Sequence, residues 1–131
     1  MATDTLARYG QEPAPLDPDT MQKLNVFLPS FWSRGNPIDI LGDASAERFG
    51  HALEVCLKSK NLDGVLVILA PQALTDPLSV AETLAAAMQD RRYPVFACWM
   101  GGKRIATAVD VLNAAGIPTY DTPERAVRAF L

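Results

Sequence analysis

The sequence is poor in the residues on which most catalytic and metal sites depend. It has one histidine, His51, and two cysteines, Cys56 and Cys98. His51 has no cysteine, histidine or carboxylate at metal-ligand spacing, so we expect a surface residue and no metal site. The cysteines fall inside a predicted helix and a predicted strand, which indicates buried free thiols rather than a disulfide. We therefore predict no Ser-His-Asp triad, no Cys-His pair and no catalytic residue.

Several motifs and surface patterns are missing as well. There is no G-x-S-x-G elbow, no P-loop lysine motif and no G-x-G-x-x-G after a strand. No apolar run approaches the ~20 residues that cross a membrane, and no signal peptide is visible at the N-terminus. The net charge is −3 and the basic residues are scattered, so neither nucleic acid nor a membrane surface is an expected partner. The length of 131 residues predicts a single domain, residues 1–131, which we expect to be cytoplasmic.

The most informative stretch is the apolar run at residues 65–70, bounded by Gly64 and Pro71. An apolar run without polar alternation is typical of a strand covered on both faces, as in a parallel sheet. A second such run occupies residues 95–100. We expect Ile68, in the middle of the first run, to be fully buried.

Helix start signals alternate with these strands. A capping residue precedes proline at Asp17-Pro18, Asp76-Pro77 and Thr122-Pro123. Residues 38–41 suit a short edge strand and residues 117–120 a last strand, while Phe31 and Trp32 would cover the sheet edge or fill a core corner. The order predicts an α/β fold, a parallel sheet with helices on both faces.

The candidate binding site lies where the first buried strand ends. In open α/β sheets, ligands bind at the carboxyl ends of the strands, near the helix N-termini. Backbone N–H groups in such a loop can bind phosphate or a carboxylate. The residues expected to do so are Pro71, Gln72, Ala73 and Thr75. The loop at residues 100–103 is a second place of this kind, although Gly101-Gly102 also fits a simple turn.

Five segments together resemble one family. Residues 35–44, 65–69, 98–102, 115–120 and 122–127 resemble the NDP-forming acyl-CoA synthetases. The similarity is greatest to the bacterial acetate–CoA ligase type, which often carries a fused protein lysine acetyltransferase. This resemblance implies a succinyl-CoA-synthetase-like flavodoxin domain, similar to the C-terminal domain of the succinyl-CoA synthetase β subunit.

The resemblance also implies a role within a larger enzyme. The parent enzyme would convert acyl-CoA, phosphate and ADP into acid, CoA and ATP, through an acyl phosphate and a phosphohistidine, with Mg²⁺. CoA, ATP or ADP and Mg²⁺ would belong to the parent, and none of them to this domain. The phosphohistidine lies on another domain in the family, so His51 does not correspond to it. The other domains of the synthetase are the expected partners.

The family pattern opens with a strand and a glycine-rich loop that this sequence does not show. We therefore expect a piece of a larger protein that starts one element late, with the first strand missing between residues 38–41 and 65–70. An uncovered strand edge favours association. Residues 65–70 could pair directly with residues 38–41 after a local collapse, or two copies could meet edge to edge, with or without exchange of residues 1–10. We favour the second, a homodimer.

Two other functions fit the same sequence. The chain could be an independent flavodoxin-like domain that binds a small anion or regulates another protein. It could also be an interaction module that only docks other domains. All three hypotheses predict that the chain alone is inactive as a ligase.

Overall fold

The computed structural model describes residues 2–40, 45–60, 62–69, 76–88, 93–100 and 105–131. Three helices come first within these residues, and strands and helices alternate after them. Their order is α1 (Ala2–Arg8), α2 (Pro18–Phe27), α3 (Ala46–Leu57), β1 (Val65–Leu69), α4 (Pro77–Ala87), β2 (Val95–Trp99), α5 (Ala106–Ala114), β3 (Thr119–Tyr120) and α6 (Pro123–Phe130).

The three strands form one parallel sheet in the order β1-β2-β3. Along β1 and β2, Val65 pairs with Val95 and Leu69 pairs with Trp99. The short strand β3 pairs with the middle of β2. In the described part of the chain, β1 is therefore an edge strand.

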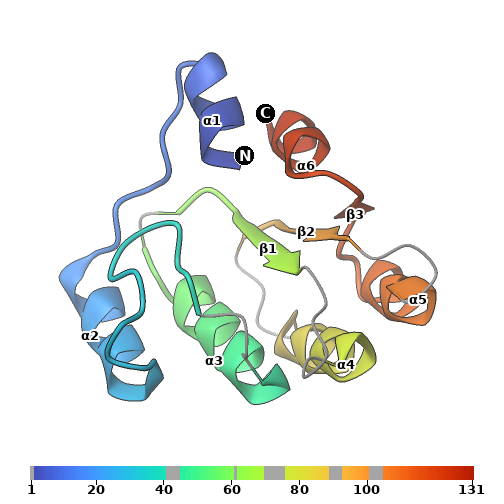
Figure 1. Ribbon diagram of the computed structural model, residues 1–131, viewed down its shortest axis with the longest axis horizontal. Coiled ribbons are helices and arrows are strands. Elements are labelled where there is room, and N and C mark those ends of the chain that lie inside the picture. Colours follow the sequence, from blue (N-terminus) through green and yellow to red (C-terminus); the bar gives the residue numbers. More distant parts are fainter. Residues whose placement is uncertain (1, 41–44, 61, 70–75, 89–92, 101–104) are drawn as a thin grey trace.

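Helices cover both faces of the sheet, as the sequence predicts (Figure 1). Helices α3, α4 and α5 lie on one face, and α1 and α6 lie together on the other. Helix α2 packs on the outside of α3. No described helix is both long enough and apolar enough to cross a membrane.

Alternate residues of the strands form the main core. Successive side chains of a strand point to opposite faces. Val65, Val67 and Leu69 of β1 therefore share one face, and they pack with buried residues of α3, α4 and α5. Leu84 of α4 and Leu112 of α5 are completely buried in this cluster.

The predicted helix starts are confirmed. Asp17, Asp76 and Thr122 each accept a hydrogen bond from a main-chain N–H of the helix that follows, and proline takes the first helical position each time. Ser45 caps α3 in the same way. The caps position the helices because each satisfies an N–H group that has no partner inside its helix.

The expectation that Ile68 is fully buried is wrong. Its side chain is 43% exposed. Ile68 lies on the edge strand, on the face that only α1 and α6 cover, and it lines a cavity beside β1. Among the described residues, β1 has a paired strand only on the side of β2, so no further strand helps to cover Ile68.

The expected strand at residues 38–41 is also wrong within its described part, residues 38–40. In the part of the chain that the structure describes, no strand pairs with the main chain of this segment. Side chains hold the main chain instead. Ser33 Oγ accepts from the Asp39 N–H at 2.9 Å, and Arg48 Nη1 donates to the Ile40 carbonyl at 2.9 Å.

A second apolar cluster holds residues 38–40 and α2 against α3. Trp32, which is buried, fills a corner of this cluster, and its Nε1 donates to Asn25 Oδ1 at 2.9 Å. Phe31 does not share that role, because its side chain is 75% exposed.

His51 is a surface residue, as expected, and its ring stacks on Phe27 with centroids 3.9 Å apart.

Candidate functional site

The predicted binding residues Pro71, Gln72, Ala73 and Thr75 lie outside the described residues. The helix that follows them, α4, begins at Asp76, whose carboxylate already accepts two hydrogen bonds. Oδ1 accepts from the Leu78 N–H at 3.2 Å, and Oδ2 accepts from Ser79 Oγ at 2.7 Å. Any anion bound before α4 would therefore lie near a carboxylate.

The next helix, α5, begins differently. Its N-cap residue, Ile105, makes no side-chain hydrogen bond to the helix. Trp99, the last residue of β2, is buried, and its indole Nε1 has no hydrogen-bond partner among the described residues. The two helix starts thus differ in charge, with a carboxylate at α4 and no side-chain cap at α5.

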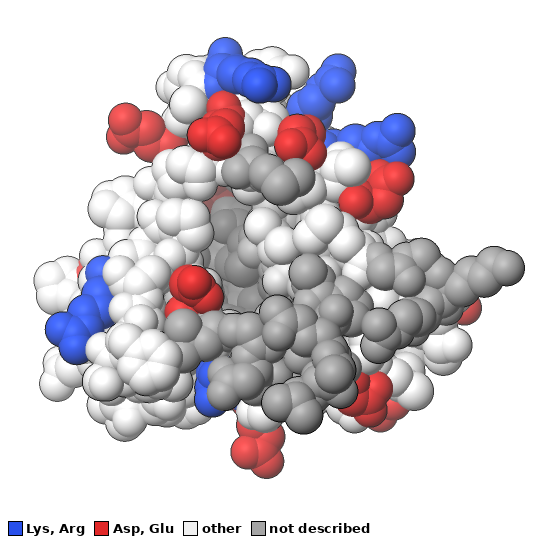
Figure 2. Space-filling view, viewed as in Figure 1, with Lys and Arg blue, Asp and Glu red and all other residues white. Residues whose placement is uncertain are grey.

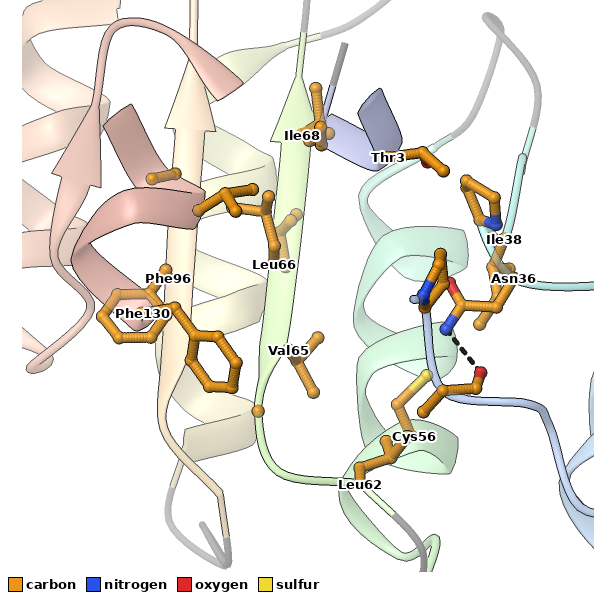
Figure 3. Close-up of a pocket in the computed structure, with 18 of the residues that line it drawn as sticks. Thr3, Asn36, Ile38, Cys56, Leu62, Val65, Leu66, Ile68, Phe96 and Phe130 are labelled. Atoms are coloured by element: carbon orange, nitrogen blue, oxygen red, sulfur yellow. Dashed lines mark hydrogen bonds between the residues drawn. The ribbon is translucent and has the colours of Figure 1, made fainter. Parts of the chain in front are cut away.

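A cavity of about 600 Å³ lies along the open side of β1 (Figure 3). The segment at residues 36–40 faces β1 across it, and α3 contributes Cys56 and neighbouring apolar side chains. Helix α1, residues 11–16 and the end of α6 line the remaining sides. The cavity lies where the sequence predicts a missing strand, between residues 38–41 and 65–70.

The hollow is visible on the surface near the centre of the face in Figure 2, below α1. Charged side chains of both signs gather over α1 and α6, away from it. The lining itself is mostly apolar. Glu12, Asp39 and Asp63 are its charged side chains, and among the described residues no lysine or arginine lines it.

The chemistry of the cavity is that of a binding groove. Its lining includes no histidine, and the described residues contain no cluster of histidine, cysteine and carboxylate side chains that could hold a metal ion. Burial raises the pKa of the Cys56 thiol to about 11, so this thiol is protonated at neutral pH. A protonated thiol is a poor nucleophile. Cys56 therefore supplies no thiolate to the cavity at neutral pH.

The sequence pattern of the Ligase-CoA domain family matches residues 1–130. The chain belongs to this family. Acetate–CoA ligase (ADP-forming) I of Archaeoglobus fulgidus is 40% identical to this chain over 130 residues. The α subunit of acetate–CoA ligase (ADP-forming) I of Pyrococcus furiosus is 31% identical over 117 residues.

The solved structures agree with the sequence comparison. The dinucleotide-forming acetyl-coenzyme A synthetase 1 of Ca. Korarchaeum cryptofilum, in complex with phosphate and ADP, matches with a TM-score of 0.90 and 34% identity over 98% of this chain. This Ligase-CoA domain chain spans only part of each relative. It covers 18% of the Archaeoglobus protein, 25% of the Pyrococcus subunit and 28% of the solved chain.

The sequence predicts a missing strand at this place but neither a cavity nor most of the side chains that line it. The groove side chains contributed by α1, residues 11–16 and α6 come from segments far apart in the sequence. These segments come together because α1 packs against α6. A helix of only seven residues has too short a sequence pattern to predict that contact. Residues 65–69 are all apolar, so the sequence carries no signal that Leu66 and Ile68 face a cavity while Val65, Val67 and Leu69 face the core.

Proposed function

We propose that this Ligase-CoA domain is a non-catalytic domain of an NDP-forming acyl-CoA synthetase, where it helps to form the acyl and phosphate site and to assemble the enzyme. The single observation that carries the proposal is the similarity of almost the whole chain to an ADP-forming acetate–CoA ligase, 40% identical over 130 residues. The parent reaction would join acid and CoA with use of ATP, or run in reverse from acyl-CoA, phosphate and ADP. CoA, nucleotide and Mg²⁺ would be bound by the parent.

The contribution of this domain would come from the carboxyl ends of β1 and β2. We propose that main-chain N–H groups of Gln72, Ala73 and Thr75, in the segment from Pro71, contact the phosphate or acyl phosphate. The position of these residues between β1 and α4 supports this, because ligands of open α/β sheets bind there. Partners would be the other domains of the synthetase, in the cytoplasm.

The experiment is a titration of the ¹⁵N-labelled chain with inorganic phosphate, read by amide chemical shifts. The amides of Gln72, Ala73 and Thr75 should shift and saturate, while sodium chloride at matched ionic strength should leave them in place. Shifts confined to other amides up to high millimolar phosphate would reject the site.

A variant at the start of α4 makes the titration sharper. Asp76→Asn keeps a capping side chain but removes the negative charge beside the proposed site, so phosphate should bind more tightly. Glu82→Gln, on the exposed side of the same helix, is the matched control and should bind phosphate like the unchanged chain. Equal phosphate affinity in the two variants would argue against a site next to Asp76.

The non-catalytic part of the proposal has its own assay. The purified chain, given acetyl-CoA, phosphate, ADP and Mg²⁺, should form no ATP or free CoA above background. The rival function, an independent anion-binding or regulatory domain, predicts the same inactivity. It differs in predicting that the chain occurs by itself, which the complete reading frame of the gene would show.

A further inference from the structure

A second, smaller pocket of about 260 Å³ lies at the end of α2. Leu28 and Trp32, which are both buried, form its apolar floor, and Asn25, Ser30 and Arg34 are the exposed residues around it. Helix α2 packs on one side of α3 and α4 on the other, so this pocket is separate from the phosphate site proposed before α4 (Figure 1). Pockets for drug-sized ligands begin near about 300 Å³, so this one suits a molecule of few heavy atoms.

The polar side chains of this pocket offer hydrogen-bond donors. Trp32 Nε1, which can only donate, bonds to Asn25 Oδ1 at 2.9 Å. That bond fixes the orientation of the Asn25 amide and leaves its Nδ2 protons as donors. Arg34 Nη2 donates to the Ser30 carbonyl at 2.9 Å, and its guanidinium has further N–H groups in the same plane. Among the described residues, no carboxylate lines the pocket or pairs with Arg34.

The backbone at Arg34 supports a role for its side chain. Its φ is 53°, in the left-handed region that favours glycine. The neighbouring Gly35 does not take a positive φ. A residue held in this region costs conformational free energy, and such residues cluster at ligand sites. The strain thus falls on the one residue that brings a positive charge to the pocket.

The lining selects one kind of anion. A planar carboxylate can take two parallel hydrogen bonds from a guanidinium, and one guanidinium balances one negative charge. An apolar floor favours a ligand that also carries an apolar group. We propose that the pocket binds a small monocarboxylate with a short apolar chain, its carboxylate at Arg34 and Asn25 and its chain over Leu28 and Trp32. The proposal goes beyond the function proposed above and does not rest on it.

The probes are butyrate, formate and butyramide, added to the ¹⁵N-labelled chain at matched ionic strength. The indole N–H of Trp32 reports on the pocket because it bonds to Asn25, and the indole N–H of Trp99, buried in the core, is the internal control. Butyrate should shift the Trp32 signal and saturate it. Formate lacks the chain and butyramide lacks the charge, so each should bind at least about fivefold more weakly. Equal binding of the three probes, or no saturable shift at Trp32, would overturn the proposal.

Inorganic phosphate separates this pocket from the site proposed before α4. Phosphate should leave the Trp32 indole signal in place, because it is larger, mostly doubly charged at neutral pH and without an apolar group. If phosphate shifts that signal as strongly as butyrate does, the pocket does not select monocarboxylates and the proposal is refuted. A phosphate titration that fails at Gln72, Ala73 and Thr75 rejects the function proposed above, whereas the Trp32 signal decides the pocket.

A matched pair of arginine variants tests the place of binding. Arg34→Gln removes the guanidinium and should weaken butyrate binding at least about tenfold, because a charge-assisted hydrogen bond is lost. Arg128→Gln removes the same charge from an exposed position on α6 and should bind butyrate normally. Equal loss in both variants would reveal general charge attraction, and no loss in either would exclude Arg34. Both results contradict the pocket.

A second pair tests the Asn25 donors without removing a cation. Asn25→Asp has nearly the same shape and can still accept from Trp32 Nε1, but it replaces the Nδ2 donors with a carboxylate oxygen. Butyrate affinity should fall at least about tenfold. The control is Asn113→Asp on α5, where Oδ1 accepts from Thr119 Oγ1 at 3.4 Å, and it should bind normally. Unchanged binding in Asn25→Asp would refute the proposed contact, and this pair decides the question if Arg34→Gln does not fold.

Discussion

At the scale of single residues, exposure separates two aliphatic side chains that the sequence does not distinguish. Leu84 and Ile68 both occur in apolar stretches, one in α4 and one in β1. Leu84 is 0% exposed in the core, whereas Ile68 lies over the open groove. Truncation of a buried side chain loses its transfer free energy and leaves a cavity, but truncation at a groove does neither fully.

Leu84→Ala should therefore lower the free energy of unfolding by about 2–5 kcal/mol, and Ile68→Ala by only about 1 kcal/mol or less. Urea titrations of both variants, fitted with a common slope, measure the two changes. A loss at Ile68 as large as the loss at Leu84 would mean that the groove is closed around Ile68 in solution.

Asp17 provides a pH-dependent contribution at the same scale. The Thr20 N–H, which donates to Asp17 Oδ1 at 2.7 Å, is the main cause of a pKa below the ordinary value of 3.8, and a hydrogen bond from Ser59 Oγ adds to it. A lowered carboxylate pKa stabilises the fold above the unfolded-state value of 3.8. This contribution is lost as the pH falls below 3.8, through the folded-state pKa.

Asp17→Asn should remove that part of the acid-induced loss of stability while keeping a side chain that caps helices well. Urea midpoints at neutral pH and near pH 3 should therefore differ less in the variant than in the unchanged chain. Asp17→Ala, which loses both the cap and the charge, should be the less stable variant at neutral pH. If the urea midpoints at the two pH values differ as much in Asp17→Asn as in the unchanged chain, other carboxylates cause the loss of stability in acid.

At the scale of elements, the sequence predicts what depends on local chemistry. The caps at Asp17, Asp76 and Thr122 and the strands β1 and β2 all follow from neighbouring residues, and the structure confirms them, although β1 is not buried on both faces. The strand expected at residues 38–41 depends instead on a pairing partner, which the described residues do not supply. The anion-binding residues 71–75 lie outside the described part, so that prediction still depends on sequence alone.

The contact between α3 and α4 makes a prediction at this scale. Gly50 of α3 lies so close to α4 that a Cβ at this position would overlap Thr83 Cγ2. Gly50→Ala gains helix propensity, about 1 kcal/mol, but the overlap should outweigh the gain and make the variant less stable by about 1–3 kcal/mol.

The control is the same change in a Thr83→Ser background. Serine lacks the methyl group, and its hydroxyl can keep the hydrogen bond that Thr83 Oγ1 donates to the Ser79 carbonyl at 2.8 Å. The cost of Gly50→Ala should therefore be smaller there, and a double-mutant cycle by urea titration measures the difference. An identical cost in both backgrounds would place the strain somewhere other than at Thr83.

At the scale of the whole molecule, the position of α1 bears on association. Helix α1 packs against α6, the last helix, and reaches it through the extended residues 11–16, with Pro13 and Pro15. A terminal helix that docks on a distant element can dock on another copy in the same way, which is a low-cost route to a dimer. Exchange of residues 1–10 is one of two ways to form the homodimer predicted from the sequence, and the other is edge-to-edge contact between the β1 strands of two copies.

The mass of the chain in sedimentation should then rise with concentration, from 14.2 kDa toward twice that value. Leu6, a half-buried residue of α1, is the place to interfere, because Leu6→Glu weakens the docking of α1 that holds an exchanged dimer together. Val26→Glu, on the exposed side of α2, is the matched control and should dimerise like the unchanged chain. A constant mass of 14.2 kDa would refute the dimer. A dimer that survives Leu6→Glu but is lost in Ile68→Lys would show that the copies meet at β1 instead, because the only element shared between them would then be the strand edge.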